Sequence, residues 1–230
     1  TIIIRYFSSK STICCDRANK KKEIRIGLFG AGMQGHTQTL AISEVFDISE
    51  VKVFDIYRPS AEKYAKDMEK VVKGKITICD SPDEVTDADA LIAVTQAHTP
   101  FLNAEMIKPG TVVFPMGSYK EVTDDLILDC DAIIVDHIGQ ALHRGALREL
   151  ALAGKITEEN IEATIGELVN GSKYIKGLEH KKILCLPIGT GAMDVALAYI
   201  AYERAKKQHI GVEFDFSGES YASEMPEKLL

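Results

Sequence analysis

Residues 24–35 read Ile24-Arg25-Ile26-Gly27-Leu28-Phe29-Gly30-Ala31-Gly32-Met33-Gln34-Gly35, an apolar run that leads into a Gly-x-Gly-x-x-Gly turn. Residues 34–45 follow with helical spacing of their apolar side chains. In a strand, turn and helix of this kind, the first glycine permits the bend, the second lets the backbone approach a pyrophosphate, and the third lets helix and strand pack. The free N–H groups of the helix N-terminus then favour the phosphate charge. We therefore expect a dinucleotide to bind at Gly30, Gly32, Met33, Gln34 and Gly35.

The next predicted strand, residues 51–55, ends in a carboxylate. Asp55 lies 23 positions after Gly32, where Rossmann-type domains place the acidic residue that binds the adenosine ribose. A 2′-phosphate would be repelled by this charge, so the sequence favours NAD over NADP. Arg58 leaves an alternative open, because a guanidinium could hold a 2′-phosphate or stack on adenine.

Short apolar runs alternate with helical stretches along the chain. Strands are predicted over residues 24–30, 51–55, 76–79, 90–95, 111–115, 132–135 and 183–186. Helices are predicted over 34–45, 59–73, 139–154, 158–169 and 191–207, with Ser81 capping a further helix from Pro82 and Gly211 ending the last one. The pattern indicates an α/β fold, a Rossmann-type doubly wound and mostly parallel sheet with helices on both faces. Its ligands are expected at the carboxyl ends of the strands.

Composition restricts the class of ligand. The chain has 230 residues, 46% of them hydrophobic, and a formal net charge of -7. An acidic chain without a basic patch argues against a nucleic-acid partner and favours a small molecule. The five cysteines form no CxxC pair or zinc spacing, so reduced, mostly buried thiols and no metal site are expected. No apolar run approaches the ~20 residues of a membrane span, and no signal-peptide core is visible. These features favour a cytoplasmic protein.

Three stretches resemble the ornithine cyclodeaminase/μ-crystallin family, and the resemblance runs from about Arg5 to Gly211. They are residues 30–38 (GAGMQGHTQ), residues 93–100 (AVTQAHTP), and residues 187–194 (PIGTGAMD) with Ala198 and residues 202–205 (YERA). The third is the most specific, because generic dinucleotide-binding domains lack it. The resemblance implies an enzyme that moves a hydride between NAD(P) and the Cα of a small amino acid or its imine. Cyclodeaminases convert ornithine to proline in this way, whereas alanine dehydrogenase and ketimine reductase members make a single hydride transfer.

The resemblance also implies roles for individual residues. Arg5 would hold the substrate α-carboxylate, which suits the fork of donors on arginine. Lys120, Glu121 and Asp194 are candidates for proton transfer, although Asp194 is equally suited to a helix N-terminus. Further cofactor contacts are implied for Thr95, Gln96, Ala97, Met116, Gly117, Ile188 and Gly189. Three histidines near strand ends or helix starts are expected to be structural or solvent-facing: His98, His137 and His143.

Two features depart from the family pattern. Family members carry a much longer segment ahead of the glycine turn, which forms much of the substrate and dimerisation domain. The loop from Met116 to Glu121 is also short and lacks the aspartate that serves the family as general base. We therefore expect residues 1–22 to be the remnant of a second, substrate and dimerisation domain. Residues 23–186 would form the NAD(P)-binding domain, and residues 187–230 would return toward the substrate domain.

Three hypotheses follow from these observations. The first is an NAD-dependent, homodimeric oxidoreductase or cyclodeaminase that acts on a small amino or imino acid. The second is a dinucleotide-binding module without turnover, comparable to μ-crystallin as a ligand carrier. The third is a truncated product of a larger gene, which a start at threonine suggests. Because the general base is missing, we expect NADH binding but little or no turnover of ornithine.

Overall fold

The computed structural model describes residues 23–44, 46–117, 120–177, 180–189 and 191–212. Arg5, Cys14, Cys15 and the predicted remnant over residues 1–22 therefore lie outside the described residues. Internal contacts divide the chain at Thr190/Gly191 into two units. The predicted domain boundaries at residues 22 and 186 stay predictions.

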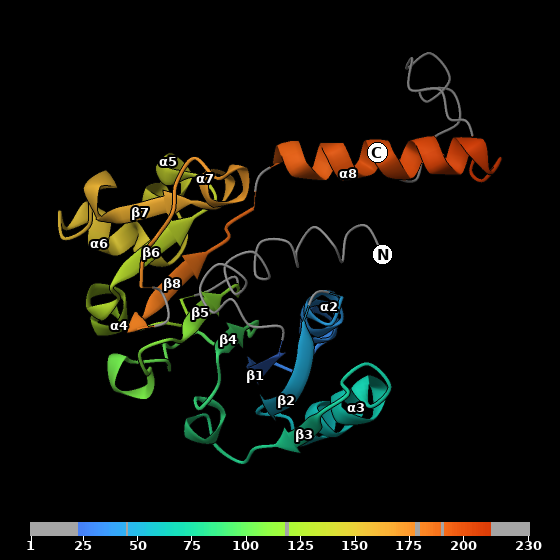
Figure 1. Cartoon of the computed structure of the whole chain (residues 1–230), viewed down its shortest axis with the longest axis horizontal. Helices are drawn as coiled ribbons and strands as arrows, with labels where there is room; N and C mark the ends of the chain where they lie inside the picture. Colours follow the sequence, from blue (N-terminus) through green and yellow to red (C-terminus); the bar gives the residue numbers. More distant parts are fainter. Residues whose placement is uncertain (1–22, 45, 118–119, 178–179, 190, 213–230) are drawn as a thin grey trace, which may run out of the picture. The chain divides into compact units, whose positions relative to one another are not determined.

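One sheet of eight strands forms the first unit, and every described pairing in it is parallel (Figure 1). The strand order is β3-β2-β1-β4-β5-β8-β6-β7, so the first strand lies inside the sheet. From β1 the chain first adds strands on one side, β2 and β3, and then adds β4 and β5 on the other side. This reversal is the switch point where open α/β sheets bind ligands. The strands are β1 (Glu23–Phe29), β2 (Asp47–Phe54), β3 (Lys75–Ile78), β4 (Ala90–Ala93), β5 (Val112–Pro115), β6 (Ala132–Val135), β7 (Ile161–Thr164) and β8 (Ile183–Leu186).

Helices of the first unit connect these strands. The α-helices are α2 (Met33–Ile42), α3 (Arg58–Met68), α4 (Asp124–Asp129), α5 (Ile138–His143), α6 (Arg148–Leu152) and α7 (Ile165–Asn170). Four single turns of 3₁₀-helix accompany them: η1 (Asp83–Val85), η2 (Ala104–Met106), η3 (Gly145–Leu147) and η4 (Glu158–Asn160). Strand and helix thus alternate as the sequence predicted, and the glycine turn joins β1 to α2.

Two buried apolar layers cover the two faces of the sheet. Successive side chains of a strand point to opposite faces, so Ile183 and Cys185 join one layer while Leu184 and Leu186 join the other. Helices α2, α3 and α7 contribute to the first layer, and α4, α5 and α6 contribute to the second. The predicted arrangement of helices on both faces is therefore confirmed, and the sheet is parallel throughout its described strands.

The structure corrects the helix predicted over residues 158–169. Residues 158–160 form η4, Ile161–Thr164 form β7 at the edge of the sheet, and α7 starts only at Ile165. The Thr164 hydroxyl accepts a hydrogen bond from the Glu167 N–H (3.2 Å), and the Glu167 carboxylate accepts one from the Thr164 N–H (2.8 Å). This capping box marks the start of a new helix. Four strand residues are too few for sequence periodicity to separate them from a helix.

Other predicted helices are shorter than expected. The helix predicted over residues 139–154 divides into α5, η3 and α6, because Gly145 has φ +75°, which an α-helix cannot contain. Ser81 does not cap a helix: its hydroxyl donates to Glu84 (3.1 Å), and only the single turn η1 follows Pro82. Helices α2 and α3 end at Ile42 and Met68, earlier than predicted.

The second unit contains one long helix, α8 (Gly191–Lys207), as the sequence predicted. The Ile210 N–H donates to the Ala205 carbonyl (3.0 Å), which satisfies a terminal helix acceptor. The left-handed residue at this end is His209 (φ +53°) rather than the predicted Gly211, which takes φ +115° two positions later. No helix among the described residues is long and apolar enough to cross a membrane.

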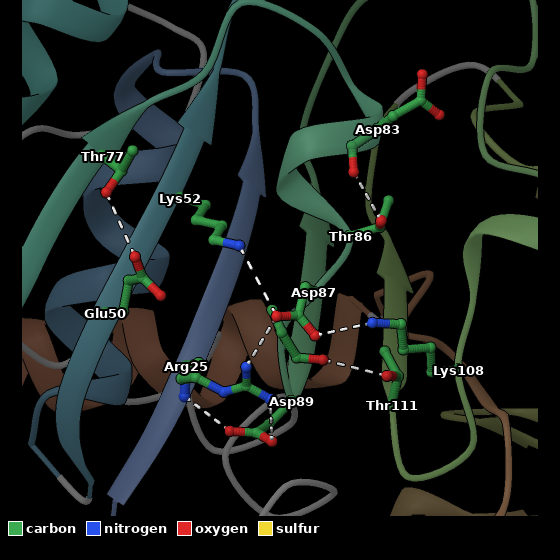
Figure 2. A network of polar contacts seen from close by, with 11 residues as sticks. Arg25, Glu50, Lys52, Thr77, Asp83, Thr86, Asp87, Asp89, Lys108 and Thr111 are labelled. Carbon is green, nitrogen blue, oxygen red and sulfur yellow. Dashed lines mark hydrogen bonds and ion pairs between the residues drawn. The ribbon is translucent and has the colours of Figure 1, made fainter.

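A charged network joins the strands near the amino ends of β4 and β5 (Figure 2). Asp87 forms ion pairs with Arg25 (3.2 Å) and Lys108 (3.1 Å), and Asp89 accepts a hydrogen bond from the Arg25 N–H (2.9 Å). The hydrogen bond from Lys108 and the nearby Arg25 charge hold the pKa of Asp87 below its usual range. Partly exposed pairs of this kind each contribute about 0–1 kcal/mol. The network lies at the amino ends of interior strands, at the end of the sheet opposite the glycine turn.

Candidate functional site

The glycine turn combines two structural glycines with one that faces open space. Gly30 has φ +96°, and a Cβ at this position would lie 2.8 Å from the Val94 carbonyl. A Cβ on Gly35 would lie 2.5 Å from the Gly30 carbonyl. A Cβ on Gly32 would meet nothing within 4 Å. Gly30 and Gly35 are therefore required by the fold, whereas the space above Gly32 is open.

Asp55 follows β2 and holds the glycine turn in place. One carboxylate oxygen accepts the Ala31 N–H (2.8 Å) and the other accepts the Tyr57 N–H (2.9 Å). A carboxylate has about four acceptor positions, so each oxygen can accept one further donor. The carboxylate can thus bind a ribose hydroxyl while it keeps both main-chain contacts.

Arg58, the residue that could favour NADP, is engaged with acidic partners. Its guanidinium pairs with Asp80, which follows β3, and with Glu62 one turn along α3 (3.3 Å). These two carboxylates already neutralise the charge that a 2′-phosphate would need.

A cavity of about 550 Å³ lies at the switch point of the sheet. Its walls come from the carboxyl ends of β1, β2 and β4 and from the loops that follow them. They include the predicted residues Gly30, Gly32, Asp55, Thr95, Gln96 and Ala97, together with Phe29, Phe54, Ile56, Pro82, Val94, Thr99 and Phe101. The apolar members can take an adenine ring, and Asp55 can take its ribose.

Glu121 links the loop after β4 to the loop after β5. Its side chain is fully buried, and one oxygen accepts both the N–H and the hydroxyl of Thr95 (2.7 Å each). The other oxygen accepts the Gly117 N–H (2.9 Å). Burial raises the pKa of the Glu121 carboxyl, and the hydrogen bonds from Thr95 and Gly117 oppose that rise. The structure thus gives Glu121 a positioning role, and its predicted part in proton transfer stays a prediction.

A second cavity, of about 470 Å³, lies beside the carboxyl ends of β5 and β8. The predicted residues Met116, Gly117 and Ile188 line it, together with Pro115, Ala141, Arg144, Gly145, Ala146, Leu147, Leu186 and Pro187. Gly189 has φ +94°, and its N–H donates to Asp136 at the end of β6 (2.6 Å). Gly117 thus borders the second cavity and Thr95 the first, with the Glu121 carboxylate between them.

The other predicted residues lie apart from the two cavities or are exposed. Lys120 pairs with Asp124, Met33 and Gln34 are exposed at the start of α2, and Asp194 is exposed in the first turn of α8. The three histidines His98, His137 and His143 are also exposed, and His137 caps α5. Cys79 and Cys185 are buried thiols and Cys130 is half-buried. Within the described residues, no three His, Cys, Asp or Glu side chains gather as a metal site.

Sequence reasoning missed Asp136 and Arg144. Asp136 has the same signal as Asp55, an aspartate directly after an apolar strand, and both bind the main chain of a glycine loop. Arg144 had no signal, because it stands in a segment that was predicted to be one continuous helix. The positioning contacts of Glu121 could not be found either, since Thr95 lies 26 residues away in the sequence.

These features coincide with a known family. A sequence model of the ornithine cyclodeaminase/mu-crystallin family matches residues 15–209. The chain belongs to this family. Arg5 precedes the matched residues, so its substrate role, like the catalytic roles of Lys120 and Asp194, stays a prediction.

Individual members of the ornithine cyclodeaminase/mu-crystallin family are similar over most of this chain. An alanine dehydrogenase of Archaeoglobus fulgidus is 30% identical over 200 residues, which are 86% of this chain and 62% of that protein. The chain spans less than two thirds of the length of several such curated relatives. Among solved structures, a Thermococcus litoralis Delta(1)-pyrroline-2-carboxylate reductase in complex with NADH and L-proline matches at TM-score 0.82 with 27% identity, over 92% of this chain and 68% of that one. An archaeal alanine dehydrogenase dimer with bound NAD also matches at TM-score 0.82 with 27% identity, over 93% and 68%.

Proposed function

We propose that the chain binds NAD(H) and that it belongs to an enzyme that transfers a hydride at the Cα of a small amino acid or its imine. The observation that carries the proposal is the open space above Gly32 at the switch point, flanked by Asp55 and the Thr95 loop. Relatives whose structures contain NADH or NAD match this chain over more than nine tenths of its length. The homodimer, the cytoplasmic location and the absence of a nucleic-acid partner stay predictions.

The residues present fit each part of the cofactor. The first cavity would hold adenosine, with Asp55 binding the ribose, and the pyrophosphate would lie over Gly32 at the start of α2. The nicotinamide would then extend past Thr95 and Gly117 toward Ile188, which lines the second cavity. Bound NAD supplies hydride transfer; the chain supplies orientation, a partly apolar wall around the reacting carbon, and the Glu121 link that keeps the two loops in register.

Substitutions of two aspartates test the preference for NAD over NADP. We expect Asp55→Ala to weaken NAD binding by roughly 1–3 kcal/mol, the scale of a lost hydrogen bond to a charged group. Adding Asp80→Asn removes one partner of Arg58 and should raise NADP affinity further. Titration of both cofactors into wild type, the single variant and the double variant measures these shifts, with exposed Asp83→Ala as the control. A wild type that prefers NADP would contradict the assignment to Asp55.

A binding module without turnover is the second candidate function. The observation that favours it is that Lys120 is paired with Asp124 and both oxygens of Glu121 are engaged, so neither is poised as a base at the second cavity. We expect NADH to bind the full chain and proline formation from ornithine to run below about 1 s⁻¹, the low end of ordinary enzymes. Absorbance of reduced nicotinamide with a panel of amino acids detects a net dehydrogenation. A direct assay for proline follows ornithine, because cyclodeamination returns its hydride and leaves the amount of NADH unchanged. Ornithine turnover at or above that rate would contradict the binding module.

A further inference from the structure

The second cavity contains one charged side chain among its described lining residues, that of Arg144. Its remaining lining residues are uncharged, and Arg144 is solvent-exposed at its opening. A cleft with charge of one sign concentrates ligands of the opposite sign. The charge at this cavity therefore favours a negatively charged group.

The backbone of Arg144 is fixed at the rim of this cavity. Arg144 ends α5, and its N–H donates to the Gln140 carbonyl (3.0 Å). Gly145 follows with φ +75°, and a Cβ on it would lie 3.8 Å from the Ile188 side chain, so the turn packs against the loop after β8. The arginine thus lies next to the loop that is proposed to contact the nicotinamide.

The guanidinium of Arg144 has no partner of its own. Across the part of the chain that the structure describes, it has no hydrogen bond and no ion pair. The nearby Arg148 differs, because its guanidinium binds Glu149 (2.5 Å), and Arg58 and Arg25 also bind carboxylates. An arginine without a counter-ion at a cavity is suited to a ligand carboxylate, which its planar fork can bind through two parallel hydrogen bonds.

We propose that Arg144 binds a carboxylate of the substrate in the second cavity. This proposal rests on the proposed function, since it places the acid beside bound nicotinamide. Either of two carboxylates could be this group: the α-carboxylate that every amino or imino acid carries, for which Arg5 is also a candidate, or a second carboxylate on an acidic side chain. Arg144 would orient the substrate through this group and would take no part in proton transfer.

The test uses the full chain and begins with NADH titration followed by fluorescence. Pyruvate and 2-oxoglutarate are then titrated separately into the NADH-saturated protein, as a monocarboxylate and a dicarboxylate probe. We expect Arg144→Gln to weaken acid binding by roughly 10- to 100-fold, because the charged pair of hydrogen bonds is lost and an amide can replace only one of them, while NADH affinity is unchanged. Arg144→Lys, which keeps the charge without the fork, should fall between. Arg148→Gln is the matched control and should bind both acids like wild type.

Loss of affinity for both acids would assign Arg144 to the α-carboxylate, and loss for 2-oxoglutarate alone would assign it to a side-chain carboxylate. The proposal is overturned if Arg144→Gln binds both acids like wild type, or if Arg148→Gln loses as much affinity. It is also overturned if NADH-loaded wild type binds neither acid. If the wild-type chain does not bind NADH, the proposed function is contradicted, and the proposed role of Arg144 is contradicted as well.

Discussion

Replacing Gly32 by valine is expected to abolish NADH binding and leave the folded protein as stable as wild type. The reason is that a side chain at this position meets no atom of the protein within 4 Å but enters the space proposed for the pyrophosphate. Gly32 has φ -78°, which any residue adopts, so no backbone strain accompanies the change. Fluorescence titration with NADH and urea denaturation measure the two effects separately.

Two further glycine variants control this experiment. Gly35→Val places a side chain 2.5 Å from the Gly30 carbonyl and should destabilise the fold itself. Gly166 lies in α7, which follows the edge strand β7, and a Cβ on it would meet nothing closer than 3.9 Å. Gly166→Val should therefore change neither measurement by much. NADH binding by Gly32→Val at wild-type affinity would contradict the assignment of the pyrophosphate to the space above Gly32.

Replacing Glu121 by alanine is expected to reduce both stability and cofactor affinity. The change leaves the partly buried N–H groups of Thr95 and Gly117 without their acceptor, and a fully buried group of this kind would cost about 1–3 kcal/mol. Because both groups are only partly buried, the free energy of unfolding should fall by about 1–3 kcal/mol in total. NADH affinity should fall as well, because the loops after β4 and β5 are no longer joined.

Urea denaturation and NADH titration, both at neutral pH, measure these losses. Glu121→Gln should lie between wild type and Glu121→Ala, since an amide keeps one oxygen acceptor and turns a donor toward the other N–H. Glu105→Ala, which removes an exposed carboxylate on η2, serves as the matched control. The effect of an ordinary surface substitution on the free energy of unfolding is within about 0.5 kcal/mol. A free energy of unfolding of Glu121→Ala within that range of wild type would show that the link between the two loops is unimportant.

Local patterns predicted the features that depend on neighbouring residues in the sequence. The glycine turn, Asp55 after β2 and the long helix from Gly191 each combine short spacing with one known geometry, and the structure places all three as predicted. The doubly wound sheet followed from the alternation of strands and helices. Six of the predicted site residues meet at one cavity: Gly30, Gly32, Asp55, Thr95, Gln96 and Ala97.

Features that depend on contacts across the sheet were beyond sequence reasoning. β7 was missed because its four residues are flanked by polar turns that resemble a helix start. The buried position of Glu121 depends on Thr95, and the exposed cation at Arg144 depends on where Gly145 breaks the helix. Neither relation has a fixed spacing, so only the folded chain shows that Glu121 joins two loops and that Arg144 lines the second cavity.

The position of β8 has a consequence for how the protein is made. This strand is the last of the sheet to leave the ribosome, yet it pairs with β5 on one side and β6 on the other. A nascent chain that stops before Ile183 therefore holds a five-strand sheet and a separate pair of strands, each with an open edge prone to wrong pairing. The strands around the first cavity can form during translation, whereas the loop after β8, which lines the second cavity, takes its place only when synthesis has passed Gly189. A chain arrested ahead of β8 would thus contain the strands around the first cavity but would lack the β8 residues that line the second cavity.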